Sequence, residues 1–194
     1  MRPLTLSLAL LVAAATAFAQ DSTSTPSSTS TSTSTDADKP LRVIMWSELK
    51  AQGAELPGTI MPPTDDRPFE VLRVANQTGK PRTITVFTLA EPGITESKWM
   101  FSGEVHYEKV LGKAYLELLN QLTDGQTYFS RTLQPDGPMA WITGNSGWRP
   151  FALPFNAWKP GNRPTKIVFN VVLPQRGVID LSPIEVHEGF AASP

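Results

Sequence analysis

From Leu41 onward, the chain consists of short apolar or alternating runs that are separated by Pro, Gly, Asn and Asp residues. Such runs are typical of antiparallel strands joined by turns. The chain also contains 18 prolines, which disfavour long helices because proline lacks the backbone N–H that a helix needs. The sequence therefore predicts an all-β protein.

The alternation predicts about nine strands. Two sheets are needed to bury the apolar faces of so many strands, so we expect an antiparallel β-sandwich. The alternation is clearest within residues 98–108, where it places Trp99 and Phe101 on the core face. Asp124 and Gly125 separate two runs and predict a tight hairpin. The predicted strands lie near residues 41–46, 69–76, 82–90, 98–108, 113–122, 126–133, 149–155, 165–173 and 177–188.

The absence of cysteine limits how this domain is stabilised and attached. Without cysteine the chain forms no disulfide and has no lipobox, so we do not expect a lipid-anchored lipoprotein. Residues 40–190 are numerous enough for one self-sufficient hydrophobic core. We therefore expect a single domain over 40–190, which packing alone stabilises and which we expect to be a monomer.

The N-terminus predicts export. Arg2 is the only charged residue in the first 19, an apolar run follows, and Ala17 and Ala19 give the small-x-small pattern that signal peptidase cleaves. We expect a signal peptide at 1–19 and a secreted or periplasmic mature chain that begins at Gln20. The apolar run is shorter than the roughly 20 residues that span a bilayer, so a retained anchor is the weaker alternative.

A low-complexity tract follows this leader. Between residues 22 and 35 every residue except Pro26 is Ser or Thr, and the tract has no apolar side chain to bury. We expect residues 20–39 to be disordered. The tract is either a spacer or a solvated N-terminal tail, and cleavage after Ala19 favours the tail.

The formal net charge of −1 narrows the choice of partner. Binding to nucleic acid or to an anionic membrane surface requires clustered positive charge, which this composition does not supply. Uncharged ligands fit the composition best. We therefore predict no nucleic-acid partner and no transmembrane segment after cleavage.

Three segments resemble galactose-binding-like jelly rolls, a fold that includes many secreted bacterial carbohydrate-binding modules. In residues 98–118 an aromatic strand, WMFSGEVHYEKV, runs through a Gly-Lys turn into the strand KAYLEL. Residues 147–155 place a tryptophan before a short aromatic strand, and residues 166–186 contain KIVFNVVLP, a Gly turn and a closing strand. The resemblance covers roughly residues 41–188 and implies a jelly-roll sandwich that binds carbohydrate.

Carbohydrate sites combine aromatic faces with polar side chains that hydrogen-bond hydroxyl groups. If strands 98–108, 113–122 and 165–173 share one sheet, its outward side chains are Glu104, His106, Tyr115, Glu117, Gln121 and Asn170. Trp141 and Trp148 flank a turn-rich loop and are candidates for stacking on a sugar. The alternatives are a solvated face with a Glu117–Arg131 ion pair, and tryptophans that cover the sandwich edge. The predicted ligand-binding residues are Glu117, Arg131, Asn170, His106, Tyr115, Trp141 and Trp148.

Metal and cofactor sites are not indicated. His106 and His187 alone do not supply the three or four ligands of a zinc site. The prediction is no metal and no cofactor. A structural calcium site remains the alternative, with oxygen ligands drawn from Asp36, Asp38, Asp65, Asp66, Asp180 or Glu185.

The chain shows no strong catalytic pattern either, since it has no Cys and no Gly-x-Ser-x-Gly motif. We therefore predict no catalytic residue and a non-catalytic binding domain, with carbohydrate as the favoured ligand. A protein partner is the first alternative, and an apolar patch around Leu119, Val168 and Val172 would favour it. A glycan hydrolase that uses Glu104 and Glu117 across neighbouring strands is the second.

Overall fold

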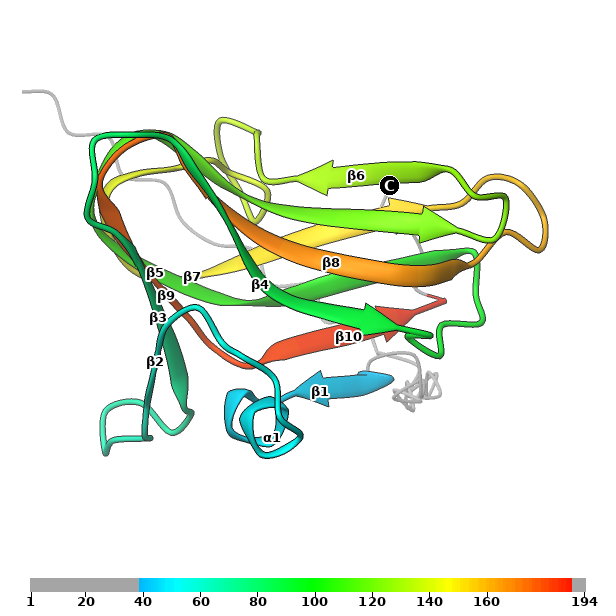
Figure 1. The fold of residues 1–194 in the computed structure, drawn as a ribbon, viewed down its shortest axis with the longest axis horizontal. Coiled ribbons are helices and arrows are strands. Elements are labelled where there is room, and N and C mark those ends of the chain that lie inside the picture. The colour runs from blue at the N-terminus through cyan, green and yellow to red at the C-terminus, as the bar shows by residue number, and fades with distance from the viewer. Residues whose placement is uncertain (1–38, 190–194) are drawn as a thin grey trace, which may run out of the picture. The chain divides into compact units, whose positions relative to one another are not determined.

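The computed structural model describes residues 39–189 of the 194-residue chain (Figure 1). The predicted signal peptide at 1–19 and residues 20–38 of the predicted disordered segment lie outside the described residues. Within residues 39–189, no helix is long and apolar enough to cross a membrane. Its elements are β1 (Arg42–Ile44), α1 (Trp46–Ala51), β2 (Thr59–Met61), β3 (Val71–Asn76), β4 (Arg82–Ala90), β5 (Lys98–Leu122), β6 (Thr127–Arg131), β7 (Ile142–Asn156), β8 (Pro164–Leu173), β9 (Gly177–Leu181) and β10 (Ile184–Glu188).

The strands form two antiparallel layers, so the predicted all-β sandwich is confirmed. Sheet I contains β1, β2, β3, β7, β9, β10 and the first part of β5. Sheet II contains β4, β6, β8 and the last part of β5. Figure 1 shows the strands of sheet II side by side, from β6 through β5 and β8 to β4.

The strand β5 differs most from the prediction. Residues 98–108 and 113–122 were expected to be two strands with a Gly-Lys turn between them, but β5 is one strand of 25 residues. Gly112 has a positive φ of 77° without reversing the chain. Val110 and Ala114, on either side of it, still pair with β7. Gly112 therefore lies in an irregular part of the ladder, not in a turn.

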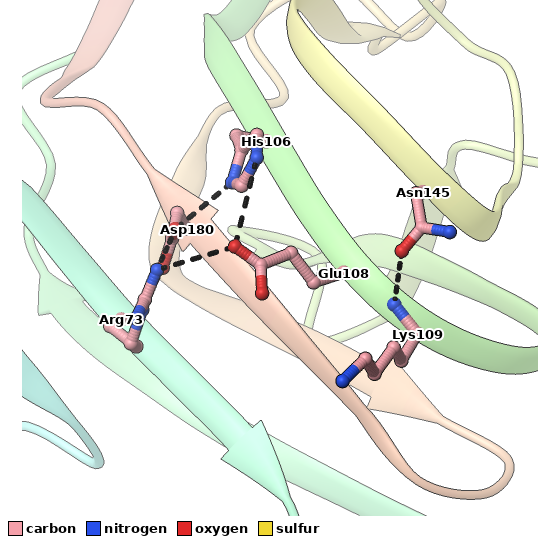
Figure 2. Close-up of polar contacts among 6 residues, drawn as sticks. All are labelled: Arg73, His106, Glu108, Lys109, Asn145 and Asp180. Carbon is pink, nitrogen blue, oxygen red and sulfur yellow. Dashed lines mark hydrogen bonds and ion pairs between the residues drawn. The ribbon is translucent and has the colours of Figure 1, made fainter.

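The buried positions of β5 change from odd to even residue numbers within the strand. Trp99, Phe101, Val105 and Tyr107 are buried before Lys109, whereas Val110, Ala114, Leu116 and Leu118 are buried after it. Lys109 has a φ of 51°, and its backbone N–H donates to Asn145 Oδ1 on β7 over 2.8 Å (Figure 2). This bulge lets both parts of β5 keep their apolar side chains in one core while the strand passes from sheet I to sheet II.

Aromatic rings join the two sheets in the core. Phe87 on β4 stacks on Phe169 on β8, with ring centroids 5.3 Å apart, and also on Phe101 on β5. Phe151 on β7 packs against Phe169 from sheet I. Trp99 is fully buried as predicted, and its indole N–H donates to Asn120 Oδ1 over 3.0 Å.

Three other local predictions can be compared with the structure. The Asp124-Gly125 hairpin between β5 and β6 is confirmed, because the Leu122 amide donates to the Gln126 carbonyl over 2.9 Å. The Gln126 amide also donates to Asp124, which lowers the pKa of that carboxyl group. The predicted strand 177–188 is two strands that Ser182 and Pro183 separate, and β2 and α1 were not predicted.

Candidate functional site

A groove of about 650 Å³ lies on the outer face of sheet I. Its walls come from β1, from the loop before β3, from β5 and β7, and from the junction of β9 and β10. The lining residues are Val43, Met45, Pro63, Pro68, Phe69, Glu70, Ser102, Gly103, Glu104, Pro150, Phe151, Ser182, Pro183 and Glu185. Five separate segments of the chain therefore build one concave surface.

The interruption between β9 and β10 explains why sheet I is irregular at this groove. Pro183 has no N–H for the sheet ladder. The Ser182 hydroxyl instead accepts the backbone N–H of Glu104 over 2.8 Å and donates to the Pro183 carbonyl over 2.9 Å. Opposite this junction stands Gly103, where an added Cβ would lie only 2.9 Å from Ser182 Oγ. A larger residue at Gly103 would therefore clash with the junction.

The polar lining of the groove is acidic. Glu70, Glu104 and Glu185 supply three carboxylates, and no Lys, Arg or His is among the lining residues. Glu70 is only 6% exposed, and its Oε1 accepts the Ser47 backbone N–H over 3.0 Å. No basic side chain of residues 39–189 forms an ion pair with Glu70.

An aromatic contact connects the groove with a neighbouring polar network. Phe69 in the groove wall meets Trp148 edge to face, with ring centroids 5.2 Å apart. On its other side Trp148 lies against His106, at 5.6 Å between ring centroids. Trp148 is half-buried and fixes the orientation of the Phe69 ring, because edge-to-face pairs prefer a defined geometry.

The polar network crosses three strands of sheet I (Figure 2). The Arg73 guanidinium on β3 donates to both carboxylate oxygens of Asp180 on β9, each over 2.7 Å. His106 Nδ1 lies 3.0 Å from Asp180 Oδ2. Since a carboxylate only accepts, we assign the Nδ1 proton to His106. The hydrogen bonds to Asp180 raise the pKa of Arg73.

Three side chains of this network could also act as metal ligands: His106, Glu108 and Asp180. Each offers one ligand atom, and these atoms lie within 4.8 Å of one another. Arg73, however, already occupies both oxygens of Asp180 and lies 3.8 Å from Glu108. A metal ion would have to displace this guanidinium, so the cluster is arranged as an ion-pair network with Arg73 as its cation.

The outer face of sheet II brings three predicted residues, Glu117, Arg131 and Asn170, together in one hydrogen-bonded row. Arg131 Nε donates to Glu117 over 2.6 Å, and Asn170 donates to the other Glu117 oxygen over 3.0 Å. Thr85 completes this row of four strands by donating to Asn170 over 2.9 Å. The predicted Glu117–Arg131 ion pair is therefore confirmed. The polar groups of Glu117 and Asn170 mainly bind one another, which leaves them little capacity for a ligand.

Aromatic and apolar side chains surround that row. The Arg131 guanidinium lies 4.0 Å from the Phe129 ring centroid and 5.4 Å from that of Tyr115. Leu119 pairs with Phe129 on one side and Val168 on the other. Phe129 is 58% exposed. The hypothesis that such a patch favours a protein partner stays a prediction.

Two predictions about shared faces are wrong. Glu104 and His106 were expected on one face with Tyr115, Glu117, Gln121 and Asn170, but the first two lie in sheet I and the others in sheet II. The change of sheet within β5 is the reason. The proposed catalytic pair of Glu104 and Glu117 on neighbouring strands is wrong for the same reason, because both lie on β5.

The predicted tryptophans have different surroundings. Trp148 lies beside the groove, as described above. Trp141 is half-buried just before β7, and Lys113 Nζ lies 3.7 Å from its ring centroid. Of the calcium candidates, Asp180 belongs to the ion-pair network, Glu185 lines the groove, and Asp36 and Asp38 lie outside the described residues.

Sequence reasoning missed Phe69, Glu70 and Ser182 as groove residues. Phe69 and Glu70 begin a predicted strand and there look like ordinary members of an alternating run. A signal existed at Pro183, because a proline inside an alternating run marks an edge, an end or a bulge. The convergence of distant segments gives no pattern in the sequence.

Neither a protein-family model nor a curated protein matches this sequence. Solved structures similar to it include the TmCBM61 module in complex with beta-1,4-galactotriose, with 10% identity over 62% of this chain and 71% of that one, at a TM-score of 0.38. The CBM22-1 xylan-binding domain of Paenibacillus barcinonensis Xyn10C is 11% identical over 72% of this chain and 100% of its own, at 0.36. Arabinose-bound MgGH51 α-L-arabinofuranosidase is 12% identical over 76% of this chain and 24% of its own, at 0.42.

Two of these three structures are carbohydrate-binding modules, the class of domain that the sequence resembles. All three TM-scores lie below 0.5. The likeness therefore carries no argument by itself for a shared ligand or activity.

Proposed function

We propose that this domain binds carbohydrate without catalysing a reaction, and that the ligand lies in the groove on sheet I. The observation that carries the proposal is the composition of the groove, which combines apolar walls and the Phe69 ring with the carboxylates of Glu70, Glu104 and Glu185. Aromatic faces pack against sugar C–H groups, and carboxylates accept hydrogen bonds from hydroxyl groups.

The groove supports this function better than the outer face of sheet II does. The groove is concave, which lets a ligand lose contact with water on more than one side. On sheet II, Glu117 and Asn170 already bind Arg131, Thr85 and each other. A sugar there would have to break these hydrogen bonds before it formed its own.

The test is an NMR titration of the labelled protein with a panel of oligosaccharides. A single open site is expected to bind near the millimolar level, about −4 kcal/mol, so high ligand concentrations are required. We expect amide shifts at residues 69–70, 102–104 and 182–185. Glu104→Gln should weaken binding by about fivefold, the effect of one lost charge-assisted hydrogen bond.

Phe129→Ala is the matched control, because it removes an exposed aromatic ring from sheet II. It should leave binding unchanged, and no oligosaccharide should be cleaved during the titration. The proposal fails if no glycan shifts the groove amides, or if the shifts lie at Tyr115 and Arg131 instead.

We also propose that the domain acts outside the cytoplasm. This rests on the predicted signal peptide at 1–19. The intact mass of the protein from its native host should correspond to a chain that starts at Gln20. A mass that includes Met1 would contradict cleavage.

A further inference from the structure

The charged residues that line the groove are all acidic. Its lining includes the carboxylates of Glu70, Glu104 and Glu185 but no basic side chain. The Arg67 guanidinium donates to the Phe69 and Pro62 carbonyls and forms no ion pair, and His106 contacts Asp180. His187 Nε2 lies 3.2 Å from Glu185 on the same strand. Of the three groove carboxylates, only Glu185 has a basic side chain in ion-pair contact among residues 39–189, and Glu70 and Glu104 have none.

Glu70 makes this imbalance specific. Glu70 is only 6% exposed, yet its only described hydrogen bond is the one that the Ser47 backbone N–H donates to Oε1. Oε2 has no hydrogen-bond donor and no ion-pair partner among residues 39–189. Because no fully buried side-chain oxygen in this range lacks a partner, Oε2 keeps contact with solvent and is open to a ligand. A largely buried carboxylate without a cation is costly, because it has lost most of its water and gained no charge partner.

The apolar walls strengthen any charge interaction inside the groove. Val43, Met45, Phe69 and the lining prolines surround the carboxylates with apolar surface, which lowers the local dielectric constant relative to a fully polar surface. A positive group of a ligand would therefore be held more firmly here than on an open surface. A ligand with a carboxylate or sulfate group would be repelled by the same three side chains.

We infer that the groove selects a ligand with a protonated amine next to an apolar face, and that among carbohydrates this is an amino sugar with a free amine. The inference rests on the proposed carbohydrate function and names its ligand class. The amine pairs with Glu70 and its neighbours, while the C–H face of the sugar packs on Phe69.

The test compares two oligosaccharides of equal length, a glucosamine oligomer and an N-acetylglucosamine oligomer. Both are titrated into the full chain by calorimetry and NMR, at a pH between the carboxyl and sugar-amine pKa values. The glucosamine oligomer should bind about tenfold more tightly, because acetylation removes the charge and the ion pair. Its advantage should shrink as salt is added.

Glu70→Gln should remove most of the glucosamine preference while keeping the oxygen that accepts the Ser47 N–H. Glu185→Gln gives a second test at an exposed position, where folding is at little risk. Glu55→Gln removes an exposed carboxylate outside this groove and should change nothing. The N-acetylated oligomer should bind the wild type and both groove variants alike.

The possible outcomes separate this inference from the proposed function. Equal binding of both oligomers in the groove would overturn the amine preference and leave carbohydrate binding in place. If neutral glycans bind but neither of these two oligomers does, the amine preference is also overturned and carbohydrate binding stays in place. If no glycan binds at all, both proposals are overturned. Tighter binding of a lysine-rich peptide than of the glucosamine oligomer would make the groove a protein-binding site and overturn the sugar assignment.

Discussion

At the scale of single residues, Asp180 and Arg73 form an unequal pair. Asp180 is 2% exposed, whereas the Arg73 side chain is 41% exposed. Removing Arg73 would leave a buried carboxylate without its cation. Removing the charge of Asp180 would leave a guanidinium that still reaches water. The two substitutions should therefore differ in cost although they break the same ion pair.

We expect Arg73→Met to lower the free energy of unfolding by about 3 kcal/mol and Asp180→Asn by about 1–2 kcal/mol. Urea denaturation of each variant measures both values. Arg176→Met, at an exposed position in the turn before β9, is the control and should cost less than about 0.5 kcal/mol. Equal losses in the two pair variants would contradict the assigned asymmetry.

At the scale of one element, β5 depends on the bulge at Lys109. A non-glycine residue with positive φ costs roughly 1–2 kcal/mol, and here it shifts the core face by one position. Asn145 compensates in part by accepting the freed N–H of Lys109. The backbone strain at Lys109 thus accompanies the passage of β5 from sheet I to sheet II.

Lys109→Gly should raise the free energy of unfolding by about 0.5 kcal/mol, because glycine relieves more strain than it adds in chain entropy. Gln121→Gly, an exposed position of the same strand without positive φ, should instead lower it by about 1 kcal/mol. Thermal and chemical denaturation measure both. A loss of stability in Lys109→Gly that matches the loss in Gln121→Gly would show that the bulge carries no strain.

At the scale of the whole described domain, β5 couples the two sheets. It pairs with β7, β9 and β10 in sheet I and with β6 and β8 in sheet II. Neither sheet can lose this strand without disrupting the other. The domain should therefore unfold in one cooperative transition.

Phe169→Leu tests this coupling from sheet II. It should cost roughly 1–2 kcal/mol, a part of the 3–5 that full truncation of a core phenylalanine costs. Native-state hydrogen exchange should then lose the same protection in β3 and β9 as in β8. Phe129→Ala, on the exposed face of sheet II, should leave the hydrogen-exchange protection of both sheets unchanged. A loss confined to sheet II would mean that the sheets open separately.

Sequence patterns predicted the structural features that depend on residues close together in the chain or on adjacent strands. Alternation placed Trp99 and Phe101 in the core, and Asp124-Gly125 marked a hairpin, because both signals arise from local backbone geometry. The Glu117–Arg131 pair was also predictable, since it needs only two adjacent strands. The sandwich class followed from the number of alternating runs.

The site depended on long-range geometry and was only partly predictable. Gly112 looked like a turn residue, and nothing local shows that the chain continues straight through it. Because the sequence predicted two strands where the structure has β5 alone, Glu104 and Glu117 were assigned to one face. The groove escaped prediction because Phe69, Glu104 and Ser182 meet only after three distant strands have paired.

The pairing of β1 with β10 also sets the order in which the molecule can be completed. Arg42 lies opposite Val186, so the first described strand finds its partner only when the last has been synthesised. Closing so long a stretch of chain costs entropy before the contact repays it, and such topologies fold slowly. A nascent chain that stops before β10 lacks both the partner of β1 and the Glu185 wall of the groove. Folding and the formation of a complete binding surface are therefore expected to finish together, after β10 has been synthesised.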